Sequence, residues 1–286
     1  MNLRITLLGT GGSAGVPHIG GEDGAGDWGQ CDPSEPRNRR TRTSILIEGP
    51  LIAGPGHDGQ RSTLLVDTSP DMRTQLLECR VKRADAILFT HSHADHVTGL
   101  DDVRVLNRIA GRPLNAYSTQ VTLGELEARF GYAFLPWQPP GFFRPVMVPT
   151  IISPGETVDI GGLPIAVIDQ DHGFTRSLGL RCGNFGYSTD AVTLDDAAFA
   201  ALEGVDTWVV GCFQRQPHRT HAWLDRVYEW TQRVRPRRTI LTHMGNDMDW
   251  AWLVANLPPG IEHGFDGEVI EVNCAFSAPF THVNFP

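Results

Sequence analysis

The sequence predicts an α/β fold in which short buried strands pack as a β-sandwich with helices on the outside. Short apolar runs of strand length recur along the chain, and several end in His or Asp directly before a new element. Amphipathic helices lie between them, the clearest being the stretch whose apolar face is formed by Trp223, Leu224, Val227, Trp230 and Val234. The polar strand ends are expected to converge on one edge of the sandwich.

The composition indicates one large globular domain. The 286 residues are 41% hydrophobic, enough for a sizeable core, and we expect a single domain over residues 1–272 followed by a tail over 273–286. No run of eighteen apolar residues occurs, and the N-terminal apolar stretch is too short for a signal peptide. These features predict a soluble, cytoplasmic protein that does not contact a membrane.

The cysteines and the net charge argue against several classes of protein and site. The five cysteines are scattered, odd in number and without CxxC spacing, which argues against a disulfide framework and against a cysteine zinc site. The net charge of −9 disfavours a broad nucleic-acid interface. A small anionic substrate stays compatible with this charge, because bound metal ions can dominate a site locally.

The N-terminal elements alternate between strands and glycine-rich turns. Leu3–Leu8 predicts a first strand, and Gly9–Gly15 imitates a dinucleotide-binding fingerprint. Because Gly15-Val16-Pro17 stands where a helix should open, we interpret the glycines as a tight turn beside the active site. Gly20–Arg40 predicts a long loop. A hairpin is expected from Thr43–Glu48 and Thr63–Asp67, with its turn at Gly54–Gly59, and a helix over Pro70–Cys79.

The stretch Ala84–Leu100 concentrates metal-binding side chains. Ala86–Phe89 predicts a buried strand, and His91, His93, Asp95 and His96 follow it. In an extended turn His91 and His93 point the same way, because side chains alternate with a period of two. Asp95 and His96 fall at the start of a helix predicted over Asp95–Ala110, turned toward a second point. One turn could therefore serve two metal ions.

A segment rich in proline and aromatic residues follows the helix predicted over Thr119–Phe130. Gly131–Pro149 contains five prolines and five aromatic residues, so it cannot be a regular helix or a central strand. A lid over the site, a homodimer contact and buried loop packing are all compatible with such a stretch.

The second half repeats the pattern of a strand followed by His or Asp. His172, Asp190 and His243 follow strands predicted at 164–169, 184–188 and 239–242. The remaining predicted elements are strands at 177–182, 207–211, 261–263 and 268–272, and helices at 195–202 and 249–257.

The motif Thr90-His-Ser-His-Ala-Asp-His96 resembles the signature of the metallo-β-lactamase superfamily, and most of the chain is similar to its phosphoribosyl cyclic phosphodiesterases of phosphonate breakdown. The resemblance implies an αββα sandwich of two mixed β-sheets flanked by helices. It also implies two divalent metal ions, zinc or manganese. The implied ligands are His91, His93 and His172 for one ion, Asp95, His96 and His243 for the other, and Asp190 as the bridge.

The same resemblance assigns supporting roles. The aspartate matching Asp67 braces the metal loop, although a helix cap explains Asp67 or Ser69 equally well. The phosphodiesterases hold a structural zinc with several cysteines of the N-terminal loop. Cys31 stands alone in that loop, so we expect this zinc site to be absent.

The resemblance also implies a histidine that transfers a proton, and His221 is our candidate for it. We expect Thr220 to cap the helix that follows, which would place His221 in its first turn, where an anion is favoured. In the resembled phosphodiesterases and in tRNase Z, a histidine in this place acts as general acid or contacts the phosphate. His218 is the alternative, and Arg176 is a candidate phosphate contact.

The leading hypothesis is a metal-dependent phosphodiesterase acting on a small ribose- or nucleotide-like phosphate, with cyclic esters among the candidates. Asp95 and His221 are its candidate catalytic residues, and a hydroxide bridging the metals its nucleophile. A tRNase Z-like RNA nuclease and a non-catalytic nucleotide- or metal-binding sensor are the alternatives. Lactam or thioester hydrolysis is disfavoured. A flavodiiron protein needs a glutamate where His93 stands.

Overall fold

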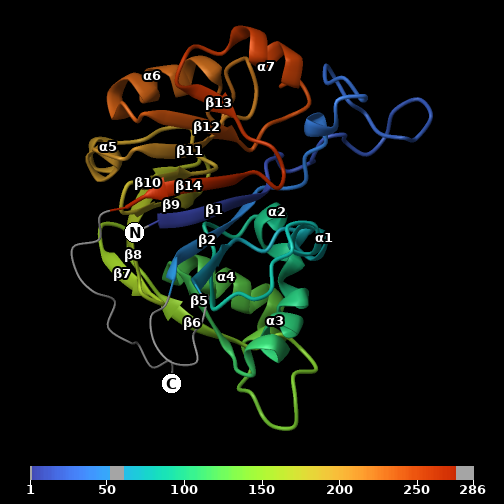
Figure 1. Cartoon of the computed structure of the whole chain (residues 1–286). Coiled ribbons are helices and arrows are strands. Elements are labelled where there is room, and N and C mark those ends of the chain that lie inside the picture. The colour runs from blue at the N-terminus through green and yellow to red at the C-terminus, as the bar shows by residue number, and fades with distance from the viewer. Residues whose placement is uncertain (1, 52–60, 275–286) are drawn as a thin grey trace.

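Two seven-stranded mixed sheets pack face to face, and helices cover both outer faces (Figure 1). The computed structural model describes residues 2–51 and 61–274. It confirms the predicted αββα sandwich. The first sheet has the order β14-β1-β2-β3-β4-β5-β6 and the second has the order β13-β12-β11-β10-β9-β8-β7.

The first sheet is formed mostly by the N-terminal half of the chain, with the last described strand at its edge. Its strands are β1 (Asn2–Gly9), β2 (Ser44–Leu51), β3 (Arg61–Val66), β4 (Ala86–Leu88), β5 (Leu114–Ser118), β6 (Met147–Ile151) and β14 (Val269–Asn273). The second sheet comprises β7 (Thr157–Ile160), β8 (Leu163–Asp171), β9 (Arg176–Cys182), β10 (Phe185–Ser188), β11 (Thr207–Gly211), β12 (Arg238–Thr242) and β13 (Ile261–His263).

The helices divide between the two outer faces in the order of the chain. The first sheet is covered by α1 (Met72–Glu78), α2 (Ala94–Val97), α3 (Val103–Ala110) and α4 (Gln120–Phe130). The second sheet is covered by α5 (Asp196–Leu202), α6 (Leu224–Val234) and α7 (Trp250–Asn256).

The strand pattern explains why both faces of each sheet are occupied. On β1, Leu3, Ile5 and Leu7 lie in the core between the sheets, whereas Leu8 packs with the helices outside. Because neighbouring side chains on a strand point to opposite faces, a strand covered on both sides must be apolar nearly throughout. The short apolar runs in the sequence have this property.

The hairpin predicted from Thr43–Glu48 and Thr63–Asp67 is confirmed, and the structure contains a second one. Strands β2 and β3 pair antiparallel, as do β9 and β10; the expected turn at 54–59 lies outside the described residues. At the other end, Asn273 still pairs with Asn2, so β14 extends one residue past the predicted strand end. The rest of the expected tail, 275–286, lies outside the described part of the chain.

The helix predicted over Asp95–Ala110 is broken, which corrects the sequence analysis. It consists of α2, a 3-10 turn at Thr98–Asp102, and α3. The backbone N–H of Gly99 donates to the Thr68 carbonyl at 3.0 Å, outside the helix. A Cβ at Gly99 would overlap the carbonyl oxygen of Ser69. This close approach of two backbones diverts the helix, and glycine makes it sterically feasible.

The start of α6 also differs from the prediction. Its N-cap is Trp223 and not Thr220, so His221 precedes the helix and does not lie in its first turn. The backbone here is held by neighbouring segments: Phe213 N–H donates to the Ala222 carbonyl at 2.9 Å, and Ala222 N–H donates to Ala191 at 2.7 Å. These bonds hold the chain outside helical geometry until Leu224.

The segment rich in proline and aromatic residues contains one 3-10 turn, Gly131–Ala133, and the start of β6. Pro149 is tolerated in β6 because that strand is at the sheet edge. Phe142 is buried, and its carbonyl accepts from Arg108 of α3 at 2.9 Å, whereas Phe143 is 79% exposed. The segment therefore combines buried packing with an exposed apolar side chain.

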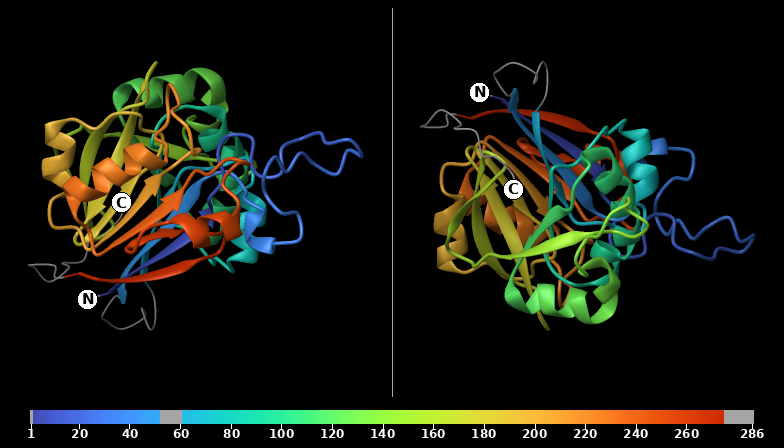
Figure 2. Two further views of the ribbon diagram at one scale, coloured as in Figure 1. Left: turned by 90° about the horizontal axis from the view of Figure 1, so that it is seen from above. Right: turned by 90° about the horizontal axis from the view of Figure 1, so that it is seen from below.

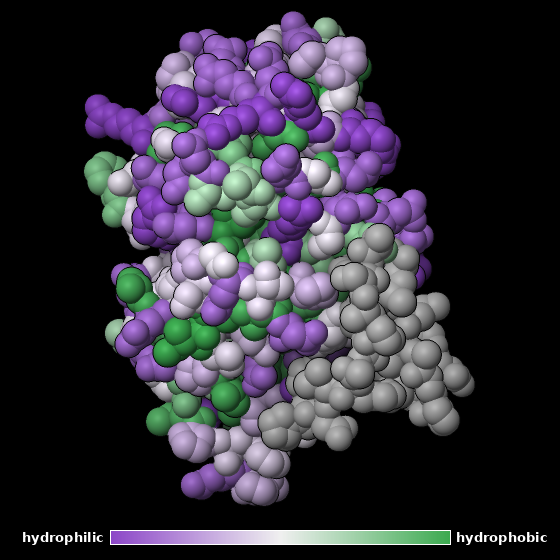
Figure 3. All heavy atoms as spheres, turned by 90° about the vertical axis from the view of Figure 1, so that its left-hand side faces the viewer, coloured by the Kyte–Doolittle hydropathy of each residue, from purple (hydrophilic) through white to green (hydrophobic). Residues whose placement is uncertain are grey.

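The N-terminal loop projects from the body of the molecule, as all three ribbon views show (Figures 1 and 2). The face on the left of Figure 1 is mainly hydrophilic, with small separate hydrophobic patches (Figure 3). Within the described ranges, none of the helices has the length and apolar character needed to cross a membrane.

Candidate metal centre

The structure brings seven predicted ligands together where strands of both sheets end. They form two groups that share Asp190, and within each group the ligand atoms lie within 4.8 Å of one another. The groups are His91, His93, His172 and Asp190, and Asp95, His96, His243 and Asp190. Their positions after β4, β8, β10 and β12 explain the convergence, because these strands end at a common edge.

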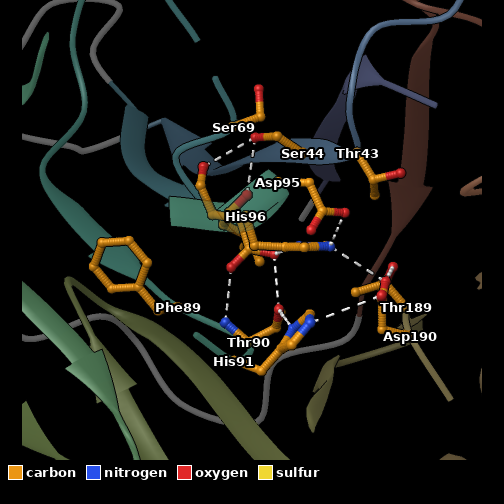
Figure 4. A network of polar contacts seen from close by, with 12 residues as sticks. Thr43, Ser44, Ser69, Phe89, Thr90, His91, Asp95, His96, Thr189 and Asp190 are labelled. Atoms are coloured by element: carbon orange, nitrogen blue, oxygen red, sulfur yellow. Dashed lines mark hydrogen bonds and ion pairs between the residues drawn. The ribbon is translucent and has the colours of Figure 1, made fainter. Parts of the chain in front are cut away.

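The two carboxylate oxygens of Asp190 face different groups. Oδ1 lies 3.4 Å from Nε2 of His96 and 3.1 Å from Nδ1 of His243. Oδ2 lies 3.8 Å from Nε2 of His91 and 3.5 Å from Nε2 of His172. In Figure 4, His96 lies between Asp95 and Asp190. A carboxylate placed in this way can join two cation sites.

Buried oxygens orient the histidines of the metal loop. Asp67 Oδ2 accepts from Nδ1 of His96 at 2.7 Å. The Thr90 hydroxyl donates to Asp67 at 2.8 Å, so it is left to accept from Nδ1 of His91 at 3.0 Å (Figure 4). With the proton on Nδ1, each neutral ring would present its Nε2 to a metal ion, and both Nε2 atoms are buried without a hydrogen-bond partner in the structure.

His172 and His243, which follow β8 and β12, are oriented in the same way, through a hydrogen bond at Nδ1. The Thr220 carbonyl accepts from Nδ1 of His172 at 2.7 Å. The Thr43 hydroxyl donates to Gly11 at 2.7 Å, so it accepts from Nδ1 of His243 at 3.1 Å. His243 Nε2 is also buried without a partner. Such second-sphere bonds leave a lone pair on the other nitrogen for a metal ion.

The pKa values of two ligand histidines are shifted in opposite directions. Burial lowers the pKa of His91 well below its ordinary value. Burial also acts on His96, but Asp190, Asp67 and Asp95 outweigh it and raise the pKa of that ring well above the ordinary value. Buried lone pairs beside clustered carboxylates carry a free-energy cost that a cation would relieve.

The donor set fits divalent metal ions. Neutral imidazoles and carboxylates suit zinc and also manganese, and none of the five cysteines belongs to either group. The Nε2 atoms of His91 and His243 are the observation that favours metal binding, because buried nitrogens without a hydrogen-bond partner are rare in the absence of a ligand.

Backbone strain is concentrated at the same place. Asp67, Asp190 and His243 have φ values of 65°, 49° and 56°, in the left-handed region that non-glycine residues seldom adopt. Each directly follows a strand or lies two residues beyond it. Strained backbone of this kind persists where surrounding contacts impose it, and it aims these side chains at the centre.

The glycine turn predicted beside the active site does lie there. Gly12 N–H donates to the Met244 carbonyl at 3.1 Å. A Cβ at Gly12 would lie 2.7 Å from the Phe213 ring and 3.7 Å from His243. The turn needs glycine because it packs directly on the residues around His243.

The three predicted substrate contacts have different positions. His221 Nδ1 is buried, lacks a hydrogen-bond partner and lies 3.7 Å from Asp190 Oδ2. The His218 ring is 5.1 Å from that of His221, farther from the ligands. Arg176 is half exposed and forms a 2.5 Å ion pair with Asp169. The contact between Arg176 and phosphate stays a prediction.

Asp67 braces the metal loop and does not cap α1. Its Oδ1 accepts the Thr90 N–H at 2.8 Å, in addition to the two bonds made by Oδ2. The N-cap of α1 is Asp71, whose side chain makes no capping bond. Ser69 instead donates to Gln75 at 2.8 Å. The helix-cap alternative is therefore wrong for Asp67. The Ser69 hydroxyl oxygen does accept the N–H of Asp71, directly before α1, at 3.2 Å.

Two further residues, which support the metal loop, were not predicted from the sequence. Glu125 of α4 accepts from the Ser92 hydroxyl, and Arg129 of α4 donates to the Ser92 carbonyl at 2.5 Å. Both contacts hold the turn between His91 and His93. The i,i+4 spacing of Glu125 and Arg129 was a visible helix signal. It did not indicate what the pair contacts.

Fold and site together define a metal-dependent hydrolase. A family model described as "Beta-lactamase superfamily domain" matches residues 62–244, which include Asp67 and all seven ligands. The chain belongs to this superfamily and has the metallo-β-lactamase fold.

Within the superfamily, the chain is also similar to a protein of the PhnP branch. A crystal structure described as "a New Diphosphatase from the PhnP Family" is 31% identical, with a TM-score of 0.82, and the match covers 96% of this chain and 99% of that one. The protein is thus a metallo-β-lactamase-fold hydrolase close to PhnP.

Two less similar solved structures share the fold, and one curated protein is similar in sequence. Zn²⁺-bound PqqB from Methylobacterium extorquens is 16% identical with a TM-score of 0.65, over 93% of this chain and 99% of that one. The short form of human tRNase Z is 14% identical with a TM-score of 0.57, over 93% and 98%. A curated octanoyltransferase of Porphyromonas gingivalis is 29% identical over 93% of this chain. The chain spans only about half, 51%, of that relative's length.

Proposed function

We propose that the protein uses two divalent metal ions, zinc or manganese, to hydrolyse a small ribose- or nucleotide-like phosphodiester, with cyclic esters among the candidate substrates. The observation that carries the proposal is the division of the Asp190 oxygens between two sets of imidazole nitrogens. We assign His91, His93 and His172 to one ion, Asp95, His96 and His243 to the other, and Asp190 to both.

When bound, two cations supply a water of lowered pKa and positive charge for the phosphate oxygens. The protein contributes orientation: Asp67, Thr90, Thr43 and the Thr220 carbonyl hold the ligand rings through Nδ1. Asp95 stays ionised, because His96 and His243 outweigh burial and lower its pKa. We therefore assign Asp95 as a ligand that also orients the attacking water.

The position of His221 supports a role in acting on the substrate. Its ring centroid is 4.8 Å from that of His172 and 4.9 Å from that of His243, so it borders both metal groups. Burial lowers its pKa to about 3 in the free protein. A bound phosphate anion would favour the protonated ring. We propose that His221 contacts the phosphate and passes a proton to the leaving oxygen. His218 would assist substrate binding.

A second candidate substrate class is a diphosphate diester, cleaved at its P–O–P bond. The 31% identical neighbour is described as a diphosphatase, which favours this class. In both substrate classes the attacked phosphorus carries two bridging and two non-bridging oxygens. The same protein groups could therefore bind and hydrolyse either one. RNA cleavage is less favoured, since the tRNase Z similarity supports the fold alone and the net charge is −9.

We further propose a cytoplasmic location. Cys31, Cys79, Cys182 and Cys212 form no disulfide with another described residue, and three of these four are buried. Free buried thiols are typical of reducing compartments. A homodimer, with the exposed Phe143 at the contact, stays a hypothesis that the mass in solution would test.

The test begins with metal-stripped protein resupplied with zinc or manganese. We expect two bound ions per chain and restored hydrolysis of bis(p-nitrophenyl) phosphate. Asp190→Asn should lower metal affinity at least about tenfold and suppress turnover. Asp196→Asn, on an exposed ion pair of α5, is the control. Cyclic ribose phosphates and dinucleotides joined by a diphosphate then distinguish the two substrate classes.

One outcome would remove the proposal. If the wild type binds two ions and hydrolyses neither phosphodiesters nor diphosphate diesters, the chain is not a phosphodiesterase. The sensor hypothesis, tested by nucleotide binding without turnover, would then take its place.

A further inference from the structure

A cavity lies away from the metal centre. Its volume is about 480 Å³, and it is bordered by strands β1, β2 and β3 and by residues 79–83, which follow α1. None of the seven metal ligands lines it. The cavity faces the outer side of the first sheet, since Arg4 and Thr6 alternate with the core residues Leu3, Ile5 and Leu7.

Basic side chains dominate this cavity. Among the described residues, eleven line the cavity; five of these are Arg or Lys, and Glu48 is the only acidic one. Two of the cations are neutralised: Arg4 pairs with Glu48 at 2.6 Å, and Arg83 pairs with Asp85 at 3.2 Å. Asp85 also accepts from the Thr63 hydroxyl.

The other three cations are not matched by carboxylates within residues 2–51 and 61–274. Arg61 donates to the carbonyls of Asn2 and Gly49 at 3.1 and 2.8 Å, which leaves its charge uncompensated. The side chains of Arg80 and Lys82 form no ion pair with another described residue, and both are exposed. Three cations without a carboxylate partner in the described part of the chain contrast with a net charge of −9 for the whole sequence.

We propose that this cavity binds a small polyphosphate ligand, such as the di- or triphosphate group of a nucleotide, at a site separate from the metal centre. Arg61 and Arg80 supply planar guanidinium groups suited to phosphate oxygens, and Lys82 supplies a mobile point charge. The volume suits a small ligand. A single hollow of this size does not fit an extended nucleic acid.

The site has a defined relation to the metal loop. Residues 79–83 lead into β4, and the far end of β4 leads into His91. Thr63, which lines the cavity, lies on β3, whose far end leads into Asp67. The polyphosphate site and the metal centre thus lie at opposite ends of the same two strands, so they can be occupied separately.

Calorimetric titration with inorganic tripolyphosphate at low salt tests the proposal. Asp190→Asn protein is titrated beside the wild type to separate this site from the metal centre. We expect binding to persist in Asp190→Asn, and to weaken at least tenfold in Arg80→Asn/Lys82→Gln. Asparagine is chosen because Arg80 has a φ of 55°, which asparagine tolerates.

Arg235→Asn is the matched control. Arg235 is also exposed, follows the C-terminus of a helix and has a φ of 54°, but it lies outside the cavity. It should leave the affinity unchanged. The proposal is overturned if tripolyphosphate does not bind, if the double variant binds as tightly as the wild type, or if Asp190→Asn alone abolishes binding. Circular dichroism of each variant verifies folding.

Discussion

The carboxylate of Asp67 accepts the Nδ1 hydrogen of His96 at 2.7 Å, and both side chains are completely buried. The same carboxylate accepts two bonds from Thr90, directly before the metal loop. A single side chain thus fixes the position of the loop and the tautomer of one ligand. This arrangement leads to the first prediction.

Asp67→Asn should weaken metal binding about 10- to 100-fold, because the amide cannot supply all three acceptor contacts. Asparagine tolerates the positive φ of this position, so the backbone is retained. Metal affinity is measured by competition with a chelator. Asp71→Asn is the control, since Asp71 binds Arg42 and not a ligand histidine. Equal affinities in the two variants would contradict the role of Asp67.

His221→Gln should lower kcat for phosphodiester hydrolysis by a factor of about 10² to 10⁴, because the proton donor is lost. His221 belongs to neither ligand group, so the metal content should stay at the wild-type value. His218→Gln, on the neighbouring ring 5.1 Å away, should change kcat much less and act mainly on KM. A loss of metal in His221→Gln would show that His221 is a ligand instead.

Arg40→Met should lower the free energy of unfolding by about 2–4 kcal/mol. Arg40 is 1% exposed, and its guanidinium donates to the carbonyls of Gly245 and Met248, which follow His243. Removing it leaves both carbonyls buried without this donor. Urea unfolding measures the difference. Arg39→Met, an exposed neighbour stacked on Trp28, should cost less than about 0.5 kcal/mol. A similar cost for both would refute a structural role for Arg40.

Glu268→Gln should remove part of the pH dependence of stability. Burial raises the pKa of Glu268 to about 7, and its Oε2 is buried without a hydrogen-bond partner. The folded state therefore binds more protons than the unfolded state between about pH 4.5 and 7. The stabilisation from this group is complete below pH 4.5 and is lost as the pH rises through 7.

The measurable quantity is the difference in unfolding free energy between Glu268→Gln and wild type. It should shift in favour of the variant by at most about 3 kcal/mol from pH 4.5 to pH 8. Glu271→Gln on β14, with a half-exposed side chain, is the control and should show no such shift. A constant difference across this range would show that Glu268 titrates normally.

Much of the fold was visible in local sequence patterns. The strand at Ile261–His263, the strand at Thr207–Gly211 and the helix end at Ala110 are confirmed as predicted, and Gly111 caps that helix in the left-handed conformation. Burial on both sides of a strand demands a short apolar run, and a left-handed helix terminus favours glycine. Such requirements act within a few residues, so the sequence expresses them directly.

The departures have long-range causes. Local periodicity predicted one helix from Asp95, but the break depends on the Ser69 carbonyl against Gly99. The expected cap at Thr220 failed because Ala222 bonds to Phe213 and Ala191. Neither partner lies in the helix that it affects. A pattern within the helix therefore could not indicate either outcome.

By itself, the sequence determined the class of strands and helices and the identity of the ligand side chains, since both depend on residue type and short spacing. Only the tertiary structure decided how those ligands are oriented. Thr43 orients His243 from 200 positions away, and the two oxygens of Asp190 divide between groups from different strands. Such contacts are set by how the two sheets pack, which leaves no local signature in the chain.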